Sequence, residues 1–159
     1  MSGIDVRQLK YLVVAPSLAA LGLNEPAAIN LVTGTALAET RAVYLRQLND
    51  GPALGLWQME PSTHDDCWAN FLNFPAQKRF LTVLRGMLSP DLPKAAQLVT
   101  NLRYAAAMTR IRFYRVAENL PLADNAAAQS AYHKKYYNSC LGSANADANT
   151  GLFQQAIDA

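Results

Sequence analysis

The chain has 159 residues, 51% of them hydrophobic and 16% charged, with a net charge of +2 at neutral pH. This length predicts one domain that buries its core without crosslinks. The small positive charge argues against a dedicated nucleic-acid-binding protein, and no apolar run is long enough to span a bilayer. Cys67 and Cys140 lack metal-site spacing and are expected to be free buried thiols, and His64 and His133 cannot form a His-rich metal site. No metal or cofactor is therefore predicted.

The N-terminal segment VRQLKYLVVAPSLAALGL allows two interpretations. Basic residues followed by an apolar stretch loosely fit a signal peptide. Pro16, however, interrupts the apolar run, and Gly22 closes it. We therefore expect a short helix that breaks near Pro16 and ends in a turn at Gly22, and no signal peptide.

Nearly all of the remaining chain is predicted to be helical, so the expected fold class is mainly α with little or no β structure. The sequence Asn24-Glu25-Pro26 predicts the cap and first turn of a helix that runs to about Asn49. Asn49-Asp50-Gly51-Pro52 is a strong break, and a hairpin-like piece is expected around 46–57. Further helices are expected from Pro61 with a Ser62/Asp65 capping box, near 76–88, near 94–118, and near 125–141, with a weakly helical tail.

Glu39 is the one acidic residue between Pro26 and Asn49. On a helical wheel its side chain shares a face with small and apolar residues, namely Ala28, Val32, Thr35, Ala36 and Val43. Apolar surroundings disfavour the charged form of a carboxyl group, which is the condition that a general acid needs at neutral pH. The alternative is that Glu39 reaches solvent or pairs with Arg41 or Arg46.

The segment GPALGLWQMEPST, which follows a dozen residues later, combines flexible and ligand-binding residue types. Gly51 and Gly55 allow a backbone to approach a ligand closely. Trp57 offers a flat apolar face of the kind that stacks on sugars, and Gln58 offers both a donor and an acceptor. Alone, this segment predicts a turn that enters a helix, but together with Glu39 it indicates a specific family.

The two motifs resemble those of the soluble lytic transglycosylases, within the wider lysozyme-like superfamily. These proteins carry a catalytic Glu followed by Ser on a buried helix, then a Gly-Ala-x-Gly-Leu-Met-Gln segment and a Pro-x-Thr turn. Glu39-Thr40 corresponds to the first motif, residues 53–58 to the second, and residues 61–63 to the turn. Gly51-Pro52 looks like the family's glycine with one residue inserted.

Two weaker matches follow in the family's order. Asn101-Leu102, followed by small residues, resembles the third motif, and Tyr137-Asn138 resembles the Tyr-Asn-Ala-Gly motif. The fourth motif departs from the family because Ser139 replaces Ala and no Gly follows directly, so Tyr136 or Tyr132 could serve in place of Tyr137. The resemblance covers about residues 31–142.

The resemblance implies a single lysozyme-like domain over residues 1–159, with its core at about 24–142. It also implies cleavage of the MurNAc–GlcNAc bond of peptidoglycan without a cofactor. Glu39 would protonate the glycosidic oxygen, the 6-hydroxyl of muramic acid would attack, and Tyr137 would orient Glu39 or the substrate. Residues expected to contact substrate are Thr40, Gly55, Leu56, Trp57, Gln58, Tyr104 and Asn138. For Tyr104, the alternative is plain packing within its helix.

Other functions remain open at this stage. A muramidase that hydrolyses the same bond needs a second carboxylate, for which the candidates are Asp50, Glu60, Asp65 and Asp66. Each also fits a turn or the first turn of a helix, so we favour the single-acid mechanism. A virion structural protein and a glycan-binding module are the non-catalytic alternatives. By analogy, the compact size and missing signal suit a phage lysin or virion-associated lysin that acts on the bacterial wall, with peptidoglycan strands and phage virion or tail proteins as partners.

Overall fold

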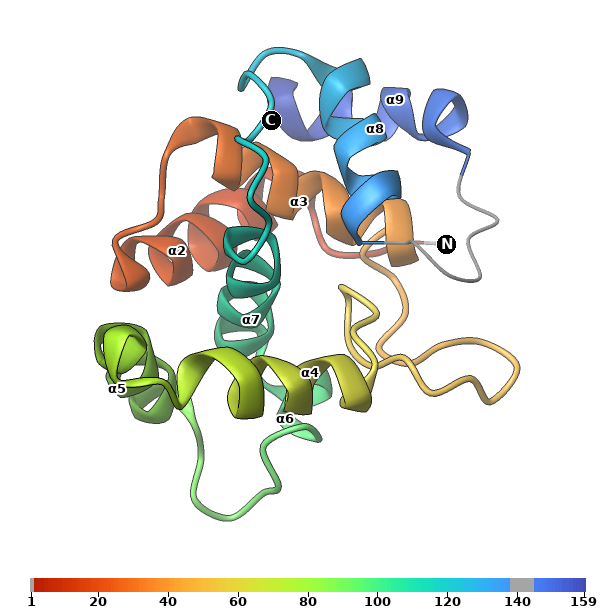
Figure 1. The fold of residues 1–159 in the computed structure, drawn as a ribbon. Helices are drawn as coiled ribbons and strands as arrows, with labels where there is room; N and C mark the ends of the chain where they lie inside the picture. Colours follow the sequence, from red (N-terminus) through yellow and green to blue (C-terminus); the bar gives the residue numbers. More distant parts are fainter. Residues whose placement is uncertain (1, 138–144) are drawn as a thin grey trace.

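The computed structural model describes residues 2–137 and 145–159, and this part of the chain is mainly helical (Figure 1). In chain order the elements are α1 (Val6–Gln8), the π-helix η1 (Leu9–Val14), α2 (Ala15–Leu21), α3 (Pro26–Thr40), α4 (Pro61–Cys67), the π-helix η2 (Trp68–Leu72), the 3-10 helix η3 (Pro75–Gln77), α5 (Lys78–Met87), α6 (Gln97–Thr100), α7 (Leu102–Tyr114), α8 (Ala126–Tyr136) and α9 (Ala146–Asp158). Within the described residues, β structure is confined to isolated bridges that join Leu54 to Arg46 and to Met59. The mainly α prediction is therefore confirmed. None of the described helices has the length and apolar character needed to cross a membrane.

Helix α3 is the centre of the packing (Figure 1). Helices α7, α8 and α9 all contact it, and α7 also contacts α4, α5 and α6, which lie at the other end of the molecule. Val32 on α3, Met108 on α7 and Phe153 on α9 are fully buried in the shared core. Gly34 makes the α3–α9 contact possible, because a Cβ atom there would lie 2.3 Å from the Cδ1 atom of Phe153. The tail that was expected to be weakly helical thus forms a core helix.

Helix α3 ends nine residues earlier than the sequence suggested, at Thr40 rather than Asn49. Arg41 and Ala42 take left-handed conformations with φ of 56° and 55°, and the Arg41 N–H bonds back to the carbonyl group of Leu37. This left-handed stop satisfies the last carbonyl groups of the helix. Glu39 consequently lies in the final turn of α3, close to the loop that follows.

The prediction of one long helix over 94–118 is wrong, because the helix is interrupted at Asn101. Asn101 has extended backbone angles, and its side-chain oxygen accepts a hydrogen bond from the Tyr104 N–H at 3.0 Å, so that it caps α7. Its amide nitrogen also donates to the Met87 carbonyl oxygen at 2.8 Å. Asn101, which resembles part of the family's third motif, is thus a helix cap that ties α7 to the end of α5.

The N-terminal prediction is correct in part. The turn at Gly22 is present, with φ of 69°, but helical backbone continues from Val6 through Pro16 to Leu21. Pro16 lies in the first turn of α2, directly after the π-helical segment, so its missing N–H falls where the hydrogen-bond spacing of the helix changes.

Two other helices start within one residue of the prediction, although the cap of the first differs. Pro61 is the first residue of α4 and Glu60 takes the cap position, so the proposed Ser62 capping box is wrong. Helix α8 begins one residue after Asn125, whose side chain caps it, and ends at Tyr136. Part of the predicted extension to Leu141 lies outside the described residues.

Candidate active site

Glu39 sits in the last turn of α3 with its side chain only 14% exposed. The C-terminal end of a helix carries partial negative charge, which disfavours an ionised carboxylate. The arginines proposed as alternative partners lie elsewhere: the Arg41 guanidinium contacts the Leu37 carbonyl oxygen, and the described residues show no ion pair between Glu39 and Arg46. Glu39 is thus a largely buried acid at the helix end where an acid is least stabilised.

The side chain that meets Glu39 is His133 of α8. Its Nε2 atom lies 2.8 Å from Oε1 of Glu39, and the imidazole is 1% exposed. Our sequence reasoning missed this contact because it considered the histidines only as metal ligands. A usable signal was present: His133 precedes Tyr137 by one helical turn, so a helix that brings Tyr137 near Glu39 brings His133 to the same face.

Tyr137 lies beside this pair but points its hydroxyl group elsewhere. Its ring stacks on His133 with centroids 5.5 Å apart, and its hydroxyl group donates to the Trp57 carbonyl oxygen at 2.6 Å. The Arg112 guanidinium lies 4.0 Å from the ring centroid. Burial, reinforced by the charge of Glu39, raises the pKa of Tyr137 well above its usual range, so it remains a neutral phenol. Tyr137 therefore anchors the loop against α8.

Thr40 and Trp57 fasten the same loop to α3. The Thr40 Oγ1 atom is 2.8 Å from the carbonyl oxygen of Leu56 and 3.1 Å from that of Ala36. The Trp57 indole N–H donates to the Val32 carbonyl oxygen at 2.9 Å, and both Leu56 and Trp57 are 1% exposed. The expectation that Trp57 stacks on a sugar is wrong, because its ring is part of the core. Leu56 and Thr40 are likewise buried scaffold residues.

Gly55 and Gln58 shape the tight turn of this loop. Gly55 has φ of 74°, and a Cβ atom there would lie 2.0 Å from the Leu98 carbonyl oxygen, so only glycine fits. Its N–H donates to the Leu45 carbonyl oxygen, and its own carbonyl oxygen accepts from the Gln58 backbone N–H and side-chain amide. Both backbone groups of Gly55 are thus used within the protein. Gln58 is the polar side chain of this motif, and it stays partly exposed.

Tyr104 is fully buried, and its hydroxyl group contacts His64 and Trp68 rather than Glu39 or His133. Its hydroxyl group is 2.6 Å from Nε2 of His64 and 2.9 Å from the indole nitrogen of Trp68. Burial raises the pKa of Tyr104 and lowers that of His64. The packing interpretation of Tyr104 is therefore correct, and the substrate-contact interpretation is wrong. Asn138 lies outside the described residues.

The candidate second carboxylates have other roles. Asp65 pairs with Nδ1 of His64 at 2.9 Å, and Asp66 pairs with Arg115 at 2.8 Å. Asp50 occupies an exposed turn with φ of 58°, and Glu60 holds the cap position of α4. In residues 2–137 and 145–159, no hydrogen bond or ion pair connects any of the four to Glu39 or His133.

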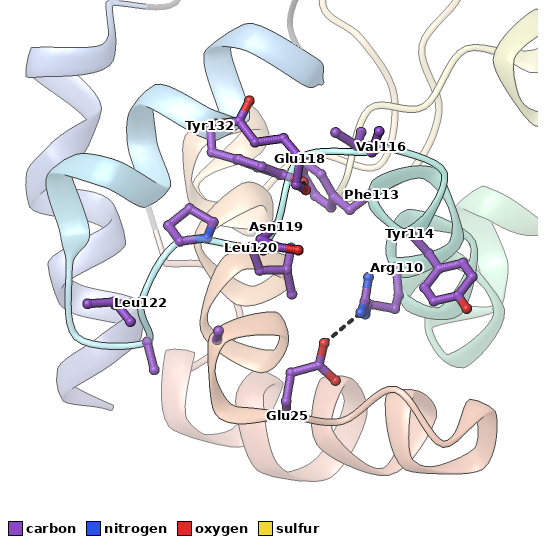
Figure 2. Close-up of a pocket in the computed structure, with 14 residues that line it drawn as sticks. Glu25, Arg110, Phe113, Tyr114, Val116, Glu118, Asn119, Leu120, Leu122 and Tyr132 are labelled. Carbon is purple, nitrogen blue, oxygen red and sulfur yellow. Dashed lines mark hydrogen bonds and ion pairs between the residues drawn. The ribbon is translucent and has the colours of Figure 1, made fainter.

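A separate pocket of about 460 Å³ lies at the opposite end of α3 (Figure 2). Glu25 and Arg110 form an ion pair in its lining, with an Nη2–Oε1 distance of 2.7 Å, and Arg110 also donates to the Leu23 carbonyl oxygen. Its remaining walls are mostly apolar side chains of residues 113–123 and Tyr132. Of the residues that the sequence singled out, Tyr132 lines this pocket, whereas its lining includes neither Glu39 nor the motif at residues 53–58.

The Glu39 site is suited to proton transfer. One carboxylate oxygen is held by His133, while the side chain keeps a small exposed fraction through which a substrate oxygen could approach. Within residues 2–137 and 145–159 no further hydrogen bond to this carboxyl group is seen. Comparisons with protein-family models, curated proteins and solved structures found no match to this chain.

Proposed function

We propose that this protein is a lytic transglycosylase that cleaves the MurNAc–GlcNAc bond of peptidoglycan, with Glu39 as general acid and then general base. One observation carries the proposal: segments that resemble the family's motifs converge on Glu39. Thr40 bonds Leu56 across 16 residues, Trp57 bonds Tyr137 across 80, and Glu39 meets His133, one turn before Tyr137, across 94. A buried acid at the unfavourable end of a helix, surrounded by this scaffold, fits a catalytic role better than a structural one.

The reaction needs only one acid. Protonated Glu39 gives its proton to the glycosidic oxygen as the bond from that oxygen to C1 of muramic acid breaks. The muramic acid 6-hydroxyl group then bonds to C1, and its proton returns to the Glu39 carboxylate, which restores the enzyme. The products are a 1,6-anhydro end and a free GlcNAc 4-hydroxyl group, and no water is consumed. This route suits a site where Asp65 and Asp66 are engaged with His64 and Arg115.

The remaining motif residues hold the site together in this proposal. Thr40, Trp57 and Tyr137 fix the loop after Gly55 against α3 and α8, which places Gln58 as the side chain available to a sugar hydroxyl or N-acetyl group. Preorganisation of this kind reduces the cost of orienting a flexible polysaccharide. A phage lysin or virion-associated lysin is the biological setting that we propose, with peptidoglycan strands as the partner.

The test is to digest purified peptidoglycan with the protein and to weigh the soluble fragments by mass spectrometry. We expect anhydromuropeptides, each lighter by one water molecule than its hydrolysed counterpart. Glu39→Gln should release none, whereas Glu25→Gln, which changes the same residue type at the other end of α3, should release them normally. Reducing ends would instead identify a hydrolase, and no product from a folded wild type would overturn the enzymatic proposal in favour of a structural or glycan-binding role.

A further inference from the structure

We propose that His133 is a positioning residue for Glu39: its neutral imidazole donates Nε2–H to Oε1 and so holds Oε2 toward the substrate. This inference rests on the proposed function and assigns a role to a residue outside the motifs of the sequence analysis. Its basis is the 2.8 Å contact between Nε2 and Oε1, made by an imidazole that is 1% exposed. A contact so well shielded from water holds its geometry in a way that a surface pair does not.

The other ring nitrogen identifies the protonation state of His133. Its Nδ1 atom is buried and has no hydrogen-bond partner among the residues that the structure describes. A charged imidazole, or a neutral one with its proton on Nδ1, would bury an N–H without an acceptor, which costs more than leaving a weakly basic nitrogen unpaired. The proton therefore belongs on Nε2, where it donates to Glu39, and the carboxyl proton that the reaction needs resides on Oε2.

The ring has little freedom to turn. It is stacked on Tyr137 at an interplanar angle of 23° and contacts Phe153 of α9, with centroids 5.5 Å apart in both cases. Among the described residues, Glu39 from α3 bonds to the imidazole, and the Arg112 guanidinium from α7 lies over the ring of Tyr137, on which the imidazole stacks. The imidazole is thus fixed by rings on two helices and aimed at a carboxylate on a third.

The proposal predicts a defect in turnover rather than in substrate binding. Without the Nε2–H donor, the Glu39 carboxyl group can rotate, and a misplacement of about 1 Å costs on the order of 100-fold in rate. His133→Leu should therefore lower kcat about 100-fold with little change in KM. His133→Gln places an amide N–H near the position of Nε2 and should restore most of the turnover. His64→Gln alters the chain's other histidine, which is equally buried, and should leave kcat unchanged.

These variants separate failure of the inference from failure of the proposed function. An inactive but folded wild type means that the proposed function is wrong. An active wild type whose His133→Leu variant turns over normally, or whose His133→Gln variant is as slow as His133→Leu, overturns the positioning role. Thermal unfolding of each variant checks that the fold is intact.

A second measurement needs neither activity nor a folded His133→Leu variant. Nitrogen-15 NMR of the imidazole rings should show His133 of the wild type as the neutral Nε2–H tautomer at neutral pH. Glu39→Ala should shift the His133 resonances and leave those of His64 in place. A protonated or Nδ1–H ring at His133, or His133 resonances that do not shift in the Glu39→Ala variant, would overturn the inference.

Discussion

The two ends of α3 each carry a glutamate that meets a buried basic side chain, yet the two pairs are built differently. Glu25 occupies the N-cap position, is 45% exposed, and pairs with Arg110, which is 4% exposed. Glu39 lies in the last turn, is 14% exposed, and pairs with His133, which is 1% exposed. One acid is at the helix end that attracts anions and has a permanently charged partner. The other is at the end that repels anions, and its partner is a buried imidazole.

This difference bears on which glutamate stabilises the fold and which is the candidate for catalysis. Glu25 neutralises a guanidinium that burial makes harder to charge, since burial lowers the pKa of Arg110 and Glu25 opposes that shift. Glu39 lies at the helix end that disfavours an anion, and it is bonded to a buried imidazole rather than to a guanidinium. Sites that keep an unfavourable charge position are typically functional. The pairs therefore provide matched variants for testing whether the Glu39 end is the active end.

The largest expected effect is on activity. Glu39→Gln should lower the rate of peptidoglycan cleavage by more than about 100-fold, because a general acid contributes roughly that much or more. Glu25→Gln should stay within a few-fold of wild type. Release of soluble muropeptides over time measures both. Equal losses in the two variants would show that the ends of α3 do not differ in function.

The next effect concerns the glycines near the two ends. Gly55 and Gly22 both have positive φ, of 74° and 69°. A Cβ atom at Gly55 would lie 2.0 Å from the Leu98 carbonyl oxygen, whereas one at Gly22 would meet nothing within 4 Å. Gly22→Ala should cost about 1 kcal/mol of unfolding free energy from backbone strain alone. Gly55→Ala should cost about 3 kcal/mol or more because strain and overlap add. Urea denaturation of both variants tests this order, and similar losses would contradict it.

A smaller effect distinguishes the two carboxylates by stability. Glu25→Gln removes an anion from the favourable end of α3 and from beside Arg110, and should cost about 1 kcal/mol because solvent screens the half-exposed pair. Glu39→Gln keeps an oxygen that can accept from His133 and removes a charge from the unfavourable end. Its free energy of unfolding should be unchanged or higher. A greater loss in Glu39→Gln than in Glu25→Gln would mean that Glu39 is structural.

The smallest expected effect is a loss of stability at acid pH that comes from His64 rather than from a residue at either end of α3. Burial lowers the pKa of His64, against the opposing influence of Asp65, so the folded state favours the neutral ring that accepts from Tyr104. Its contribution to stability is present above the unfolded pKa of about 6.5 and is lost as pH falls through the lower folded pKa. His64→Gln should flatten the fall in unfolding free energy between about pH 7 and pH 5. An unchanged slope would assign the acid sensitivity to groups other than His64.

Local patterns were enough to predict the helical class and several helix ends. Pro26 and Gly22 mark a start and a stop because proline and glycine constrain the backbone wherever they occur. Helical periodicity predicted the wrong helix boundaries at Asn101 and after Thr40. A side-chain cap starts a new helix at Asn101, and a left-handed stop ends α3 after Thr40, both within sequence that otherwise has helical character. Both breaks satisfy hydrogen bonds to distant segments, which a local window does not contain.

The sequence by itself determined that Glu39 is an isolated acid in an apolar helix and that Gly55 begins a tight turn, because both follow from residue type and short-range spacing. Only the tertiary structure decided what surrounds them. It buried Trp57 in the core, turned the Tyr137 hydroxyl group toward the loop, and brought His133 to Glu39. The physical reason is that these contacts join residues far apart in the chain, and the packing of α8 and α9 on α3 selects which of the many compatible partners meet.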